Sequence, residues 1–132
     1  MPTKKINVKP ELLEGIRELC EENSEVVLVS LCTTDGFSIK SFASKKLGAE
    51  ADKLAAMSST ITALSGSSAR QVLQSEFDIT IIETSSGNML FVSTTYLELP
   101  CVLTVAANHN MALATARYKT KNLAALVSAI ES

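Results

Sequence analysis

Few side chains in this sequence could do chemistry. The single histidine, His109, stands between two asparagines, in a short segment that separates an apolar run from a helical pattern. A general base works beside a nucleophile that it can reach through a hydrogen bond, and no residue at a recognisable spacing supplies that nucleophile. Asp35 precedes a glycine, and Asp-Gly between two strand-like runs is typical of a hairpin turn. The sequence therefore predicts turn residues at both positions.

Metal and nucleotide sites are not indicated either. No pair of cysteine or histidine residues has the spacing of zinc ligands. The stretch SGSSAR, residues 65–70, lacks the spaced glycines and the Lys-Ser/Thr pair of a phosphate-binding loop. Cys20, Cys32 and Cys101 are odd in number and lie in apolar runs, as expected of buried thiols in a reducing compartment. We expect a cytoplasmic protein with no cofactor, no metal and no active site of its own.

The composition is that of one folded domain. The chain has 132 residues, of which 46% are hydrophobic and 20% charged, and this balance suits a globule with one core. A formal net charge of -2 gives no electrostatic case for binding nucleic acid. No apolar run approaches the length of a membrane span, and the first residues lack the apolar stretch of a secretion signal. We expect a solvated tail over residues 1–9, with Lys4, Lys5 and Lys9, and a single domain over residues 10–132.

The elements that must position any site follow from hydrophobic periodicity and turn residues. Hairpin-length links join the first strand to the second and the third to the fourth, so the sheet should be largely antiparallel. The predicted fold class is an α+β sandwich with helices covering the sheet. The expected helices span residues 10–23, 51–73 and 111–130, and the expected strands span residues 26–32, 36–42, 77–84, 89–96 and a fifth segment from about 101.

The helix over residues 51–73 has an unusual composition, because much of it is serine, threonine and alanine, which a solvent-facing helix seldom uses in such numbers. At 100° per residue it carries two stripes. We expect a bulky stripe to sit on the sheet: Leu54, Met57, Ile61, Leu64 and Val72. A row of small residues falls on nearly the opposite side: Ala56, Ser59, Ala63 and Gly66.

The small row is symmetric about Ile61, and so are Asp52 and Arg70 at its two ends. Two copies of the helix that met antiparallel about a two-fold axis would therefore place complementary residues opposite each other. This pattern predicts a homodimer seam along the small row. The alternative is that these small residues pack under a loop of the same chain.

The element order resembles that of the roadblock family, which contains dynein light chains and bacterial GTPase regulators. The segments that carry the resemblance are VVLVSLCTTDGFSI, AEADKLAAMSSTITAL and FDITIIETSSGNMLFVS, and the likeness extends over roughly residues 12–130. The bacterial type that it suggests is MglB, a homodimeric regulator of a Ras-like GTPase. The resemblance implies a profilin-like sandwich in which a five-stranded antiparallel sheet has one long helix on one face and two helices on the other.

The resemblance also implies partners. It implies a homodimer in which the long helices and the third strands meet, and a surface on those helices that contacts a small Ras-like GTPase and modulates its GTP hydrolysis or switch state. MglB-type regulators remodel the GTPase, so the resemblance does not imply that an arginine is inserted at the phosphates. Two alternatives stay open: a dynein- or motility-type scaffold, and a small-molecule sensor. The candidate dimer and partner residues are Asp52, Ala56, Ser59, Ala63, Gly66, Ser67, Arg70, Phe77, Ile79 and Ile81.

Overall fold

The computed structural model describes residues 6–44 and 50–132. Three helices and five strands follow one another in the predicted order α-β-β-α-β-β-β-α. The helices are α1 (Pro10–Glu22), α2 (Ala51–Leu73) and α3 (Leu113–Ala129), and the strands are β1 (Val26–Thr33), β2 (Ser38–Ala43), β3 (Thr80–Thr84), β4 (Gly87–Tyr96) and β5 (Leu99–Asn108).

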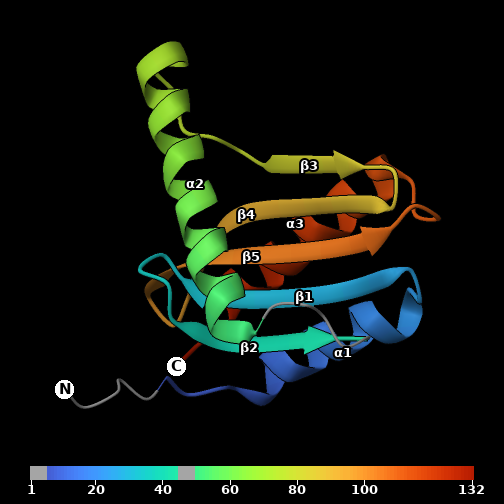
Figure 1. The fold of residues 1–132 in the computed structure, drawn as a ribbon. Helices are drawn as coiled ribbons and strands as arrows, with labels where there is room; N and C mark the ends of the chain where they lie inside the picture. The colour runs from blue at the N-terminus through green and yellow to red at the C-terminus, as the bar shows by residue number, and fades with distance from the viewer. Residues whose placement is uncertain (1–5, 45–49) are drawn as a thin grey trace.

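The five strands form one antiparallel sheet in the order β2-β1-β5-β4-β3, so β2 and β3 are its edges. The long helix α2 crosses one face of this sheet, and α1 and α3 cover the other (Figure 1). The expected α+β sandwich is confirmed, including the placement of one long helix opposite two others. The edge position of β3 leaves it open to the pairing of third strands that the resemblance implies.

The main core lies between the sheet and the α1–α3 pair. Helix α1 begins at Pro10, whose missing N–H is not needed in the first turn, and it buries the apolar stripe that its sequence predicts. The strands contribute the side chains that point to the same side as Val29 and Leu31. None of the helices in the described part of the chain combines the length and apolar character that crossing a membrane requires.

Residues 6–9 are packed against this core, although the sequence placed them in a solvated tail. The buried Tyr96 donates a hydrogen bond from its hydroxyl to the Asn7 carbonyl at 2.6 Å, and the same hydroxyl accepts the Lys9 N–H at 2.8 Å. Ile6 and Val8 contact the core from the same segment. Lys4 and Lys5, which the sequence assigned to the same tail, lie outside the described residues.

Two strand boundaries differ from expectation. Strand β3 begins at Thr80 instead of residue 77, because the preceding segment turns toward α3, where Asp78 pairs with Arg117 and Lys121. Strand β5 begins at Leu99 instead of about residue 101. It is joined to β4 by a turn of only two residues, Leu97 and Glu98, which both have positive φ. Neither is glycine or asparagine, so the usual sequence signal of such a hairpin is missing.

Gly87 lies where the neighbouring strand leaves no room for a side chain. Its φ is +150°, and a Cβ at this position would lie 2.1 Å from the Ala107 carbonyl oxygen. We expect Gly87→Ala to lower the free energy of unfolding by more than about 2 kcal/mol, because both the backbone conformation and the neighbouring strand oppose it. Urea denaturation measures the change.

The matched control is Gly36→Ala in the β1–β2 turn. Its φ is +94°, but an added Cβ would meet the Ser59 hydroxyl at an ordinary 3.5 Å. We expect a loss of about 1 kcal/mol from the backbone alone. Equal losses for the two variants would contradict the role given to the Ala107 carbonyl.

Candidate functional site

Helix α2 meets the sheet through small and hydroxyl-bearing side chains. Its buried residues lie along one side of the helix, where Leu54 and Ala55 are followed at intervals of three or four by Ser58, Thr62 and Gly66. The prediction that the bulky stripe sits on the sheet is therefore correct for Leu54, partly correct for the half-buried Ile61, and wrong for the exposed members Met57, Leu64 and Val72. The helix is rotated so that its contact side lies between the two predicted stripes. We call the contact between this side of α2 and the sheet the α2 seam.

Helix and sheet lie close together in the α2 seam, because the strands there also carry small side chains. The Thr104 hydroxyl of β5 donates to the Ser58 hydroxyl at 2.9 Å, in a fully buried position. The Cys32 thiol of β1 lies 3.7 Å from the Ala55 carbonyl oxygen. Bulkier residues on the helix would hold it away from these groups, so the rotation follows from the shallow surface of the sheet.

The bulky stripe forms an exposed flank of α2. Met57 is 48% exposed, Leu64 64% and Val72 77%. The C-terminal turns of α2 also extend past the edge strand β3, so they have no sheet beneath them (Figure 1). We call the side of α2 marked by Met57, Leu64 and Val72 the apolar flank. An apolar row of this kind on one side of a helix is typical of a surface that another protein covers.

The small row forms the opposite flank of α2, which we call the small flank. Its N-terminal part lies beside the β1–β2 turn, where Gly36 approaches both Ala56 and Ser59. This contact supports the alternative that small residues pack under a loop of the same chain. Ala63 is exposed, and Ser67 is half-buried.

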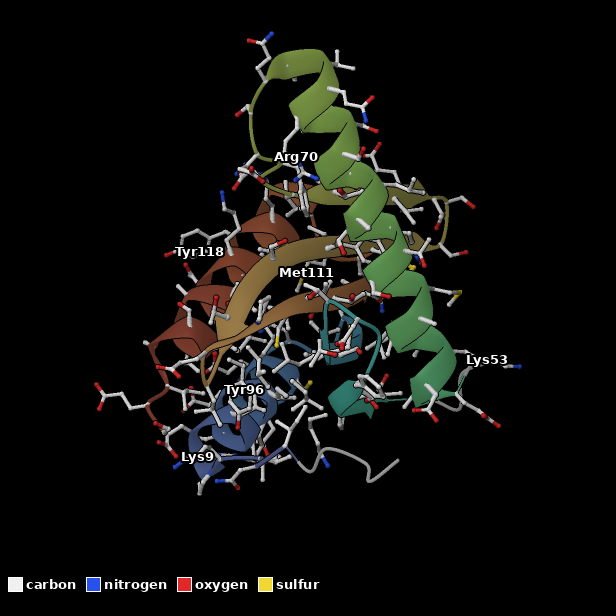
Figure 2. All side chains as sticks on the ribbon, turned by 90° about the vertical axis from the view of Figure 1, so that its left-hand side faces the viewer. Lys9, Lys53, Arg70, Tyr96, Met111 and Tyr118 are labelled. Carbon is white, nitrogen blue, oxygen red and sulfur yellow. The ribbon has the colours of Figure 1, made fainter. Side chains whose placement is uncertain are left out.

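Arg70 ends the small flank and lies at the other end of α2 from Lys53 (Figure 2). Its guanidinium folds back over Gly66, where an added Cβ would stand 3.0 Å from Nη1. It also pairs with the Glu76 carboxylate at 3.4 Å, with both side chains more than half exposed. A pair this open to solvent contributes only about 0–1 kcal/mol, so Arg70 can exchange Glu76 for another acidic partner at little cost. Asp52, the predicted partner of Arg70 across a dimer, is exposed in the first turn of the helix.

The edge strand β3 presents both backbone groups and one large apolar side chain. Its outer side has no neighbouring strand among the described residues. Ile79 and Ile81 are partly buried against the main core, whereas Ile82 is more exposed on the side that faces α2. The predicted site residue Phe77 is half-buried and precedes the strand. The structure therefore brings the edge of β3 next to the overhanging end of α2.

The residues that could have done chemistry have structural roles. The backbone N–H of His109 donates to the Ser86 carbonyl, and Asp35 accepts a hydrogen bond from the Thr33 hydroxyl inside the β1–β2 turn. Burial raises the pKa of the Cys32 thiol to about 11, and that of Cys101 to about 11 as well, so both stay protonated at neutral pH. Within residues 6–44 and 50–132, no group of histidine, cysteine and acidic side chains could hold a metal ion.

Comparison with protein-family models finds no match, and comparison with curated proteins finds none. Solved structures do match. MglB of Myxococcus xanthus superposes with a TM-score of 0.78 at 16% identity, over 92% of this chain and 95% of that one. The gliding protein MglB of Thermus thermophilus reaches a TM-score of 0.80 at 13% identity, over 97% and 95% of the two chains. This chain has an MglB-like roadblock fold. A Roadblock/LC7 domain from Streptomyces avermitilis superposes with a TM-score of 0.71 at 17% identity, over 83% and 88%.

The exposure of the apolar flank of α2 is the feature that hydrophobic periodicity did not predict. Bulky residues on one stripe of a helix usually mark its buried side, and here they do not. A signal was present in the strands: the side chains of β1 and β5 that face α2 include Ser30, Cys32 and Thr104. Where the sheet surface consists of short side chains, the row of Ala55, Ser58 and Thr62 packs closer to it than a row of leucine and methionine would.

The α2 seam makes a prediction about stability. We expect Ser58→Leu to lower the free energy of unfolding by about 1–3 kcal/mol, because added methylenes have no room between helix and sheet. The control is Thr60→Leu, an exposed position on the same helix. We expect a change within about 0.5 kcal/mol there, measured by urea denaturation. If Ser58→Leu proves as mild as Thr60→Leu, the contact between α2 and the sheet is looser than described.

Proposed function

We propose that this protein is a homodimeric adaptor that binds a small Ras-like GTPase and modulates its GTP hydrolysis or switch state, with no active site of its own. The supporting observation is the apolar flank of α2, which stands beside the open edge of β3 in an MglB-like roadblock fold. This pairing of an apolar helix side with a free strand edge suits a protein interface, and the cytoplasm is the compartment that such a role requires.

The two-fold symmetry of a homodimer decides which flank of α2 each partner uses. Two helices related by an axis perpendicular to the sheet meet through the same flank of each, so one flank enters the dimer and the other stays free. The apolar flank is the better dimer surface, because burying Leu64 and Val72 removes large side chains from water. Pairing of the two β3 edges would then extend the sheet across the axis and protect an edge that would otherwise invite aggregation.

The small flank is left for the GTPase. Its short side chains at Ala63 and Ser67 let another backbone approach closely, and Arg70 adds a cation whose present partner, Glu76, is exposed. Dimerisation and GTPase binding, both expected from the sequence on the small row, are thus assigned to different flanks of α2. Asp52, Ala56 and Ser59 belong to the GTPase-facing side in this proposal, Gly66 lies buried between that side and the sheet, and Phe77, Ile79 and Ile81 support the dimer edge.

Neighbouring residues of α2 test the division between flanks. We expect Leu64→Arg to dissociate the dimer, because it places a charge at the centre of the apolar flank. Ala63→Arg lies on the small flank, one residue away, and should leave the dimer intact. Sedimentation velocity of both variants over a range of concentrations measures the monomer fraction.

The opposite result is equally informative. A dimer that survives Leu64→Arg and dissociates with Ala63→Arg would indicate that the two copies meet through the small flank instead of the apolar flank. Ser128→Arg, at an exposed position of α3, controls for the added charge. Circular dichroism of each variant verifies that the helices remain folded.

Capture of a GTPase tests the function. The purified protein is used as bait in native cytosol, with GDP in one sample and a non-hydrolysable GTP analogue in the other. We expect a small GTPase mainly with the GTP analogue, and its loss with Ala63→Arg but not with Ser128→Arg. Capture of other proteins regardless of nucleotide would favour a scaffold, and would contradict regulation of a GTPase.

Arg70 distinguishes two ways of raising the hydrolysis rate. An arginine inserted at the transferring phosphoryl group contributes about 10³–10⁵ in rate. Because Arg70 is bound to Glu76 at the edge of the interface, we expect Arg70→Ala to change GTP turnover of the captured GTPase by less than about tenfold, a loss well below that range. A loss of three or more orders of magnitude would assign Arg70 to the phosphates instead.

A further inference from the structure

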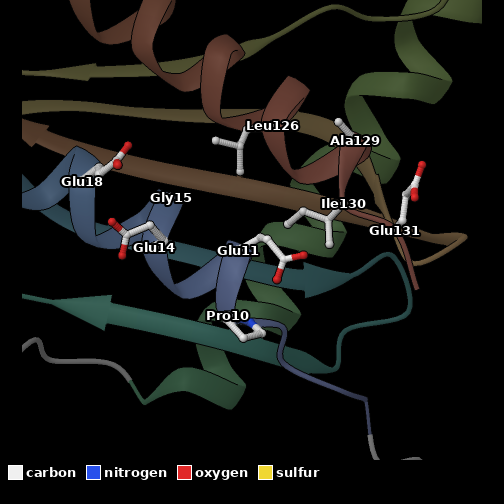
Figure 3. A pocket seen from close by; sticks show the side chains of 9 residues that line it. All are labelled: Pro10, Glu11, Glu14, Gly15, Glu18, Leu126, Ala129, Ile130 and Glu131. Atoms are coloured by element: carbon white, nitrogen blue, oxygen red, sulfur yellow. The ribbon is translucent and has the colours of Figure 1, made fainter.

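A long open groove runs between α1 and α3, on the face of the sheet opposite α2. Its widest part encloses about 800 Å³ and is shown in Figure 3. A second hollow, between Glu22 and Tyr118, continues it and shares Gly15, Glu18 and Leu126 with the first. Along α3 the combined groove extends from residue 118 to residue 130, which corresponds to about 18 Å of helix.

The floor of the groove is apolar. Leu126 of α3 and Ile130, the residue after this helix, reach into it, and Ala129 lies at its side. Leu126 is also one of the exposed large hydrophobic residues. Gly15 of α1 keeps the floor open, because a Cβ there would lie 2.9 Å from the Leu126 side chain. The two helices therefore touch at Gly15 and expose the side of Leu126 to any occupant.

The rim of the widest part is acidic. Glu11, Glu14 and Glu18 line it along α1, and Glu131 lines it at the end of α3, with no lysine or arginine among its lining residues. Of these four, only Glu14 has a cationic partner among the described residues, namely Arg17, which turns to the other side of α1 to bind Glu21 as well. Three carboxylates thus lie beside apolar side chains without an ion-pair partner in the part of the chain that the structure describes.

We propose that this groove binds an amphipathic helix of a partner protein, with apolar side chains on the floor and lysine or arginine side chains against the glutamate rim. A helix laid in a groove presents apolar residues at intervals of three and four, and about 18 Å accommodates three turns of it. The charge of the rim selects a basic helix, because an acidic one would face four carboxylates. The inference does not rest on binding of a GTPase, since α1 and α3 lie on the other face of the sheet from α2.

A second copy of this chain is a poorer occupant. In a two-fold arrangement that stacks the groove on itself, the glutamates of one copy would face those of the other. The nearest cationic group on α3, Lys119, lines only the second hollow, at the opposite end of the groove from Glu11 and Glu131, and Arg117 and Lys121 are held by Asp78. A partner whose helix carries its own cations meets the rim without this repulsion.

A synthetic amphipathic helix of about 16 residues tests the proposal, since that length spans the groove. It has leucines at intervals of three and four, with lysines beside them, and a companion peptide has glutamate in place of lysine. We expect saturable one-to-one binding of the lysine peptide by calorimetry, with amide shifts in α1 and α3 by NMR spectroscopy. Binding should weaken as the salt concentration rises, because exposed charges are screened.

Two pairs of variants locate the site. Ala129→Arg fills the groove, and Ala125→Arg adds the same side chain at an exposed position of α3 outside it. Glu18→Lys reverses the charge of the rim, and Glu21→Lys makes the same change on the other side of α1. We expect the first member of each pair to weaken binding about tenfold or more and the second to change it less than about twofold.

Three results would overturn the proposal. These are equal binding of the lysine and glutamate peptides, equal effects of Glu18→Lys and Glu21→Lys, and a change in the protein's own oligomeric state on Ala129→Arg, which would make a second copy the occupant. Because Ala129 lies far from α2, GTPase capture by Ala129→Arg should be unaltered. Failure of the groove proposal and failure of the GTPase proposal can therefore be distinguished.

Discussion

The close contact between α2 and the sheet determines how the rest of this molecule can be used. Ser58 and Thr104 meet hydroxyl to hydroxyl at 2.9 Å, and Ala55 rests on Cys32. Contacts of this size require a particular rotation of the helix about its axis, because only small side chains of the helix fit above Thr104 and Cys32. Once that rotation is set, Met57 and Leu64 have to point away from the sheet, and Val72 is exposed because the end of α2 extends past β3. The exposed apolar flank is thus a consequence of the α2 seam.

Much of the fold could be predicted from sequence because it rests on local signals. Hydrophobic periodicity predicts the bounds of α2. Asp35-Gly36 predicts the first hairpin, and the SSGN loop at residues 85–88 predicts the second. The hairpin between β4 and β5 could not be found this way. Leu97 and Glu98 have no preference for positive φ, so their conformation is imposed by the long ladder of strand pairs on either side.

The candidate site was harder to predict than the fold. A helix with a bulky stripe and a small stripe has two plausible buried sides, and periodicity selects the bulkier one. The correct orientation depends on the size of the side chains beneath the helix, and these belong to β1 and β5, which are distant from α2 in sequence. The same limitation applies to the start of β3, where Asp78 is held by Arg117 and Lys121 from α3. Both differences come from tertiary contacts.

The layers of the sandwich separate three surfaces that a single helix could not provide. The two flanks of α2 point in different directions, so a two-fold dimer that covers Leu64 leaves Ala63 accessible. The groove between α1 and α3 is separated from both by the sheet. A helix bound there, as we propose, would meet a floor shaped by Gly15 and Leu126. Because the sheet lies between the groove and α2, the partners proposed for the two faces would not compete for the same residues.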